Sequence, residues 1–353
     1  MKRLFPRALL CLALVVSVVM VASCGPKPAV SEPSGLSLPP VFQDVMSVQD
    51  LTSIGLSKIY RSSPFPGRSN IATLDLTLDA KLPKAPAIMT VYRIIPPEID
   101  YEYAIRLARQ LGFNSEPEIK QHGDLAAYYF SGGDRGLYVL TDGSIQYIDN
   151  NRVIYGAQVP SSSESIRFAQ DWLKSLGLYP EAVLRTETTS ASILVTQLRA
   201  TSTDGKTVTP TTFHVDRSGE YQFGVTINFI IGVDGYELDG MGASVMVGQE
   251  GKILEANIKL PKLEPYTTAT MKRPEDVVAL LRSYFATPAD FSKDTPVCLV
   301  DSFWENMVVS DITIKYFCMV SLDNTQSVYA QPIYMFHGGQ DTPFDARVDG
   351  LAR

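Results

Sequence analysis

The stretch GEYQFGVTINFIIGVDGYELDGMGASVMVG, residues 219–248, decides the class of fold that the sequence predicts. Aromatic and β-branched residues recur through Gly219–Ile231, which is typical of a strand. Asp234-Gly235 is a turn signal, and Ser244–Gly248 is predicted to be a further strand. The stretch therefore indicates antiparallel strands that are joined by tight turns.

Three helices are predicted among the strands. The first follows Asp100, a good helix cap, and ends near Gly112. The second begins at Ser161–Glu164, which has the spacing of a capping box, and a third begins at Pro274. Each helix has an apolar stripe that can cover one face of a sheet. We expect an α+β fold built from helices that pack on antiparallel sheets.

The first two helices match at a fixed offset, which suggests two similar units. The matching pairs are Ala104 with Ala169, Arg109 with Lys174, Leu111 with Leu176, and Gly112 with Gly177. Chance similarity between two amphipathic helices is the alternative. We expect two helix-on-antiparallel-sheet units, an N-terminal one over residues 46–160 and a C-terminal one over 161–340. Residues 341–353 are predicted to be a frayed tail.

The N-terminus has the three-part layout of a secretory signal. Lys2, Arg3 and Arg7 form a basic start, and Ala8–Met20 is almost wholly apolar. The following residues Val21, Ala22, Ser23 and Cys24 resemble the bacterial lipobox. That resemblance implies a signal peptide over residues 1–23, cleavage before Cys24, and attachment of lipid to the Cys24 sulfur.

Two other interpretations of this segment remain. A plain signal peptide could be cut after the small residues Ala22 and Ser23. A membrane anchor needs about 20 apolar residues, and Ala8–Ala22 is shorter than that. Only the lipobox also explains the cysteine. We expect an extracytoplasmic protein that a lipid holds on a bacterial membrane, with the proline-rich residues 24–45 as a flexible tether.

The charge of the chain is negative. The whole chain carries −7, and loss of the signal removes three basic residues and no acidic one, which takes the net charge to −10. An acidic protein of this kind is not expected to bind nucleic acid, or to adhere to an anionic membrane by charge. Its length is sufficient for two domains with substantial cores.

Sequence motifs of catalysis are not found. His122, His214 and His337 are far apart in the sequence, and no GxSxG or GxxxxGK[ST] pattern occurs. We therefore expect no enzymatic activity, no cofactor and no metal.

One acidic cluster, formed by Asp234, Glu237 and Asp239, is a candidate calcium site. Its spacing does not match the EF-hand loop, and hard cations need six or more oxygens. Tyr236 and Leu238 between these carboxylates suit a short strand. A turn, a strand and a turn are the preferred interpretation.

Two cysteines remain in the body of the chain, Cys298 and Cys318. They lie in the predicted strands Val297–Trp304 and Asp311–Leu322. A hairpin centred near residue 308 would place them opposite each other, so that they could form a disulfide in an oxidising compartment. The alternative is two buried thiols that pack as small apolar residues.

Residues 163–337 show an order of elements with a known counterpart. The relevant segments are the helix Ile166–Leu178, the turn segment Val233–Gly240, the pair Ala243–Val247 and Glu250–Ile253, the helix start Arg273–Asp276, and the strand Gln331–Phe336. This order resembles the PepSY-like extracytoplasmic modules, which include the YycH/YycI-type regulators. The resemblance implies helix-on-sheet units outside the membrane, no enzymatic residues, and roles in restraining peptidases or modulating sensor kinases.

The sequence thus predicts a non-enzymatic, lipid-anchored protein of the cell envelope that binds or modulates a protein or peptide partner. Strand addition at a sheet edge is one mode of such binding. The alternative is a small-molecule solute-binding lipoprotein, which would need an apolar cleft between the two units.

The lipid anchor can be tested directly. We expect that Cys24→Ser abolishes incorporation of labelled palmitate and releases the chain from the membrane fraction, because the acylated sulfur is lost. A variant that keeps its label would contradict the lipobox interpretation.

Overall fold

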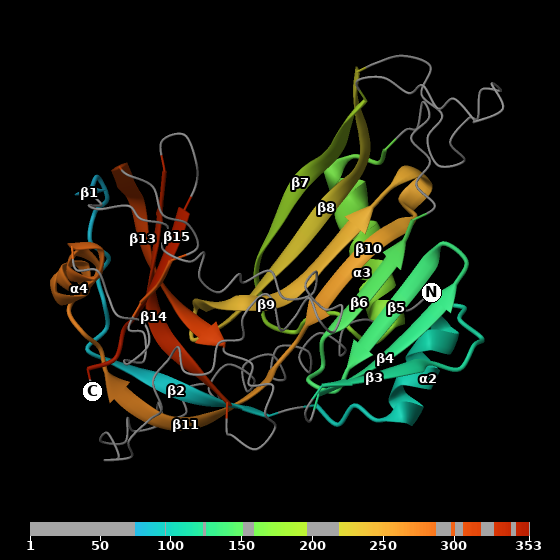
Figure 1. Ribbon diagram of the computed structural model, residues 1–353, viewed down its shortest axis with the longest axis horizontal. Coiled ribbons are helices and arrows are strands. Elements are labelled where there is room, and N and C mark those ends of the chain that lie inside the picture. Colours follow the sequence, from blue (N-terminus) through green and yellow to red (C-terminus); the bar gives the residue numbers. More distant parts are fainter. Residues whose placement is uncertain are drawn as a thin grey trace, which may run out of the picture.

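The computed structural model describes residues 75–95, 97–122, 125–150, 159–195, 219–286, 298–300, 306–318, 328–339 and 344–352. The lipobox residues Val21–Ser23, the lipid site Cys24 and the predicted tether lie outside these ranges. The described residues form one mixed sheet of 15 strands and three α-helices. Figure 1 shows that the sheet bends into two parts. We call the part at the left of the view the first wing and the part at the right the second wing.

The second wing is an antiparallel sheet of eight strands, with β9 shared between the wings. In spatial order the strands are β3 (Glu118–His122), β4 (Leu125–Gly132), β5 (Arg135–Leu140), β6 (Ile145–Asp149), β10 (Ile253–Lys259), β9 (Tyr236–Val247), β8 (Gly219–Val233) and β7 (Val183–Val195). The short 3-10 helix η1 (Gln249–Gly251) joins β9 to β10. Alternate residues along these strands face two sides of the sheet.

Two helices cover one face of the second wing. They are α2 (Tyr101–Gln110) and α3 (Ser162–Ser175), and their starts follow the sequence prediction. The Asp100 carboxylate accepts a hydrogen bond from the Tyr103 amide, and Ser161 and Glu164 form the expected capping box. The buried helix side chains Leu107 and Leu173 share one core with strand residues such as Leu137, Ile227 and Val245.

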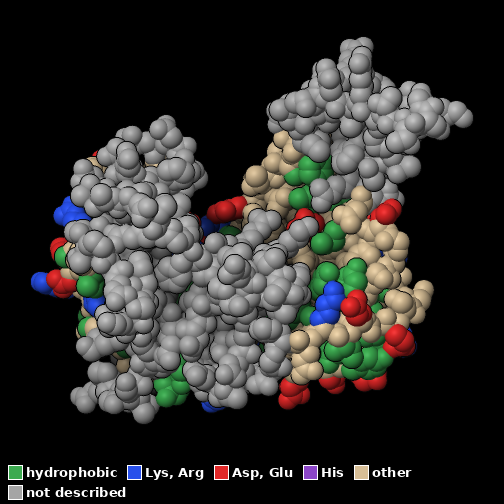
Figure 2. Space-filling model, viewed as in Figure 1, with side chains coloured by type: hydrophobic (Ala, Val, Ile, Leu, Met, Phe, Trp, Pro, Cys, Tyr) green, Lys and Arg blue, Asp and Glu red, His purple; other side chains and the backbone are tan. Residues whose placement is uncertain are grey.

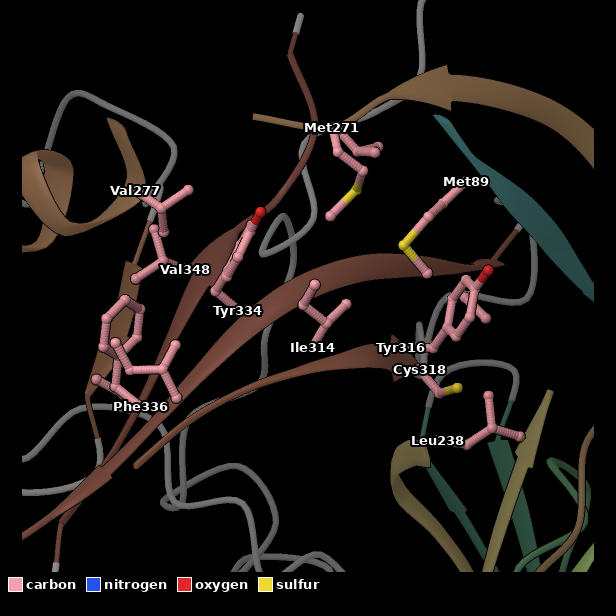
Figure 3. Packing of buried hydrophobic residues seen from close by; sticks show 14 of the residues in the cluster. Met89, Leu238, Met271, Val277, Ile314, Tyr316, Cys318, Tyr334, Phe336 and Val348 are labelled. Atoms are coloured by element: carbon pink, nitrogen blue, oxygen red, sulfur yellow. The ribbon is translucent and has the colours of Figure 1, made fainter. Parts of the chain in front are cut away.

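The first wing contains the remaining strands. Their order runs from β11 (Lys262–Thr270) through β2 (Ile88–Ile95) and β14 (Val328–Gly338) to β13 (Asn306–Cys318), and β1 (Asp75–Leu78), β15 (Phe344–Asp349) and β12 (Cys298–Val300) join at the side. Helix α4 (Pro274–Ala286) covers one face. Its core includes Tyr316, Tyr334, Phe336 and Val277, and Figure 3 shows Leu238 of β9 close to Cys318 within this core.

The predicted pair of helix-on-sheet units is wrong. Strand β2, from the expected N-terminal unit, pairs with β11 and β14, which belong to the expected C-terminal unit. Strand β6 likewise pairs with β10 across the expected boundary at residue 160. The fold is a single large mixed sheet with few helices. Hydrophobic periodicity indicates which face of a strand is buried, but it does not specify the neighbouring strand.

The C-terminal tail is not frayed within its described residues. Strand β15 pairs with both β14 and β12, so it is held on two sides. Leu351 follows it, is 1% exposed, and forms an isolated bridge with Met271. The predicted frayed tail over residues 341–353 is therefore wrong for the described residues 344–352.

The expected cysteine hairpin is also wrong. Strand β12, with Cys298, pairs with β15 rather than with β13, and Cys298 lies opposite Val348. Cys318 lies opposite Ala330 of β14 and is a free, buried thiol. Burial raises the pKa of the Cys318 thiol well above its usual value, which keeps it protonated. The geometric basis for a disulfide between the two residues is therefore gone.

The pairing across residue 160 predicts that the halves depend on each other. A fragment of residues 161–353 lacks β6, which pairs with β10, and β2, which pairs with β11 and β14, so it would expose unpaired strand edges and apolar core. We expect no cooperative unfolding transition for this fragment in urea, whereas the full chain should show one. A cooperative transition of the isolated fragment would contradict the single-sheet fold.

Candidate functional site

The acidic segment Asp234–Asp239 lies where the two wings meet. Strand β9 begins beside β13 and continues into the second wing, so one strand serves both parts (Figure 1). Its contact with β13 is short and parallel, and it pairs Tyr316 with Leu238 and Phe317 with Asp239. Side-chain bonds of the acidic segment supplement this short pairing, and we call them the junction clasp.

Asp234 connects the turn before β9 to the core of the first wing. Its φ of 54° and the φ of 81° at Gly235 form the tight turn that the sequence predicted. The Tyr92 hydroxyl donates to the Asp234 carboxylate at 2.6 Å, while the Tyr316 hydroxyl donates to the Thr90 carbonyl at 2.9 Å. Burial, and then the bond and charge of Asp234, raise the pKa of Tyr92 above its ordinary value. The phenol therefore stays a neutral donor.

Glu237 and Asp239 complete the clasp with cations from three strands. Lys315 Nζ and Arg185 donate to Glu237 at 2.8 Å and 2.7 Å, and Arg347 Nε donates to Asp239 at 2.5 Å. Burial would raise the pKa of Glu237, but the hydrogen bonds and charges of Lys315 and then Arg185 outweigh it and lower that pKa. Of the three carboxylates of the calcium candidate, Glu237 and Asp239 thus already have cationic partners, and Asp234 has a tyrosine hydroxyl as its partner.

Glu237 also shows how the two wings face each other. Arg185 pairs with Ile230, the neighbour of the helix-facing Phe229, so Arg185 lies on the face of the second wing opposite α2 and α3. Lys315 alternates with the core residue Tyr316, so it lies on the face of the first wing opposite α4. Because both side chains reach Glu237, these two faces meet at the clasp. We call them the inner faces.

The inner face of the second wing carries a row of polar side chains, one from each strand. Register pairing aligns all eight at the same level. From β7 to β3 they are Glu187, Asn228, Ser244, Asn257, Gln146, Tyr138, Tyr129 and Glu118. We call this set the polar row.

The polar row is charged only at its ends. Glu187 and Glu118 are exposed, whereas Gln146 at the centre is only 3% exposed. The rings of Tyr129 and Tyr138 stack with centroids 4.5 Å apart, and the Lys120 ammonium lies 5.1 Å from the centre of the Tyr129 ring. The buried Asn257 Oδ1 has no hydrogen-bond partner. Six neutral residues between the ends therefore offer amide and hydroxyl groups.

The inner face of the first wing carries a histidine between two aspartates. His337 of β14 pairs in register with Asp311 of β13 and with Asp345 of β15. His337 Nδ1 lies 2.6 Å from Asp345 Oδ1, and the bond from His337 lowers the pKa of Asp345. Ser310 Oγ donates to the main-chain oxygen of His337 and not to its ring. The geometry orients the imidazole but does not supply an activated serine.

The structure brings together residues that the sequence separated. In the sequence the three histidines are far apart, and no local pattern reveals the Asp311–His337–Asp345 alignment, since it depends on the register of three strands. His214 and the side chain of His122 lie outside the described part. In that part no group of three His, Cys, Asp or Glu residues could hold a metal ion, and no helix is long and apolar enough to cross a membrane.

The surface of the second wing adds acidic charge at its rim. Figure 2 shows acidic side chains along the lower edge, where β3 and α2 lie in Figure 1. Isolated apolar side chains such as Ile119 are also exposed on this edge. A rim with single exposed apolar residues is ordinary protein surface and defines no binding site by itself.

Comparisons with known proteins do not assign a family. No protein-family model matches the chain, and no curated protein sequence matches it. A solved structure of an uncharacterized protein from Eubacterium rectale ATCC 33656 is similar at a TM-score of 0.45 and 12% sequence identity, over 79% of this chain and 88% of that chain. That similarity is too low to carry an argument about this chain.

The clasp predicts a specific dependence of stability on pH. We expect Glu237→Gln to lower the free energy of unfolding at pH 7 by about 1–3 kcal/mol, because the charged bonds to Lys315 and Arg185 are lost. Glu237 has a lowered pKa in the fold, so its contribution is present above the ordinary glutamate pKa of about 4.3 and disappears as the pH falls through the folded value.

Urea unfolding at pH 7 and at pH 3 measures this dependence. The free energies of unfolding of the Glu237→Gln variant and the original chain should differ at pH 7, and this difference should be smaller at pH 3. Glu264→Gln is the matched control, since Glu264 is exposed and its ammonium partner Lys262 is 3.7 Å away. An equal difference at both pH values would contradict the role assigned to Glu237.

Proposed function

We propose that this chain is a lipid-anchored extracytoplasmic protein that binds a protein or peptide partner and catalyses no reaction. The N-terminal sequence ending in Cys24 supports the anchor and the location outside the cytoplasm. The polar row on the inner face supports a binding role. It is the single observation that carries the proposal, because eight strands place their polar side chains at one level.

The chemistry of the polar row fits an extended polypeptide. Its six neutral members span five strand spacings, which is about 24 Å at about 4.8 Å per spacing. An extended chain of about seven residues has that length. Its alternating N–H and C=O groups match the amide of Asn228 and the hydroxyls of Ser244, Tyr138 and Tyr129, which are partly exposed and can both donate and accept. A partner that contacts only the six neutral members, between Glu187 and Glu118, needs no charge of its own.

A small polar solute is the second candidate, and the stacked tyrosines favour it. Tyr129 and Tyr138 form a flat, half-buried aromatic surface beside the amide of Gln146. Such a combination suits a compact ligand with one apolar face and several hydroxyls. A panel of metabolites in a thermal shift assay separates the candidates, because a ligand well above its dissociation constant raises the melting temperature.

Site-specific photocrosslinking in intact cells tests partner binding. A photoreactive residue at Asn228, on the polar row, should give a discrete adduct with another protein. Asp171 on α3 is the matched control, since it is exposed and lies on a helix that covers the opposite face. Ser244→Tyr, which adds bulk beside Asn228, should reduce the adduct. Absence of an adduct at Asn228, or equal adducts at both positions, would contradict the proposal.

A further inference from the structure

Strand β7 forms a long open edge of the second wing. It runs for 13 residues, and among the described strands it pairs with β8 alone. The side chains of Leu184, Arg185, Glu187–Ser190 and Ser192 are exposed, so both faces of the strand are accessible along most of its length. Its outward N–H and C=O groups can therefore accept another strand.

Two other open edges of the sheet, β11 and β3, carry features that block strand pairing. Strand β11 contains Pro265, which has no N–H to donate, and its register shifts next to that residue. Strand β3 has only five residues and includes Glu118 and Lys120. Strand β7 has neither proline nor lysine, which distinguishes it from both.

The regular part of β7 has defined limits. Its ladder with β8 is irregular between Val183 and Arg185 and again between Ala191 and Ser192. Between these irregularities lies the regular stretch Arg185–Ala191, and Thr188 is its central residue. A bulge bends a strand and increases its twist, so an added strand fits best on the stretch between two bulges.

From this edge we infer that β7 pairs antiparallel with β7 of a second copy of this chain, about a two-fold axis at Thr188. This arrangement uses the whole regular stretch and continues the sheet of one copy into the other. The same surface then serves both copies, as a two-fold interface requires. The inference does not depend on the proposed lipid anchor or on partner binding.

The sequence of β7 is complementary to itself in this register. The opposing residues are Arg185 with Ala191, Thr186 with Ser190, Glu187 with Thr189, and Thr188 with Thr188 of the second copy. Two of these kinds of pair place hydroxyl residues opposite each other, and a third places the Thr189 hydroxyl opposite the Glu187 carboxylate. Such cross-strand pairs stabilise sheets. Like charges never lie opposite each other.

Other registers are less favourable. Pairing about Thr186 would place Arg185 opposite Glu187 of the second copy, but it would extend past the irregularity at Val183–Arg185. Arg185 also needs no new partner, since it already bonds Glu187 at 2.6 Å and Glu237 at 2.7 Å. The contact is one strand pair on a hairpin, so it buries less than the 1,200–2,000 Å² or so of a standard interface, and we expect a weak dimer.

Disulfide trapping of the purified full chain tests the register. Across an antiparallel pair, the Cα atoms of two residues at position 188 lie about 4.5–5.5 Å apart, within disulfide range. Residues at position 189 are offset by two places, about 8 Å apart, which is too far. With oxidised glutathione, Thr188→Cys should give a covalent dimer at least tenfold faster than Thr189→Cys. The unsubstituted chain, with its own cysteines, gives the background.

Sedimentation of the full chain at rising concentration tests the association without a new thiol. We expect reversible dimers that Thr188→Lys abolishes, because two ammonium groups would meet at the axis, and that Thr188→Val retains. Circular dichroism and the melting temperature check that both variants fold. A chain that stays monomeric at several hundred micromolar, dimers that persist in Thr188→Lys, or equal trapping at positions 188 and 189 would each overturn the inference.

Discussion

The ion-paired junction at β9 is the interaction on which the rest of this structure depends. The wings share one strand, and the backbone pairing between β9 and β13 covers only Tyr316 with Leu238 and Phe317 with Asp239. Glu237 adds bonds to a lysine of the first wing and an arginine of the second. Both side chains of the Glu237–Lys315 pair are at least 85% buried, since they are 15% and 12% exposed, so little solvent screens it.

The clasp also decides which surfaces can act together. Arg185 and Lys315 lie on the inner faces of different wings, and both bond the Glu237 carboxylate. The two inner faces therefore meet at Glu237. The polar row lies on one of these faces, and the alignment of Asp311, His337 and Asp345 lies on the other. The helices cover the opposite faces, where the apolar cores lie. The inner face of the first wing also carries buried apolar side chains such as Ile333 and Met335, so the polar groups share it with apolar packing. The open edge of β7 lies at the margin of the other inner face.

Local features of the sequence were predictable because they depend on near neighbours. The helix caps Asp100 and Ser161, and the turn at Asp234-Gly235, formed as expected because capping bonds and positive φ are set within a few residues. The first turn and the start of a strand in the acidic cluster were correctly predicted, but the second turn was not found, because β9 continues from Tyr236 to Val247. The cationic partners of Glu237 are 52 and 78 residues away from it. No local pattern specifies those partners.

The sequence alone determined the types of element, the positions of several caps and turns, and the prediction of an anchored N-terminus at Cys24. Only the tertiary structure decided that β2 and β6 pair across residue 160, that β12 pairs with β15 rather than with β13, and that His337 lies between two aspartates. The physical reason is that alternation of side chains fixes the buried face of a strand, whereas the choice of neighbour and register depends on the packing of the whole sheet.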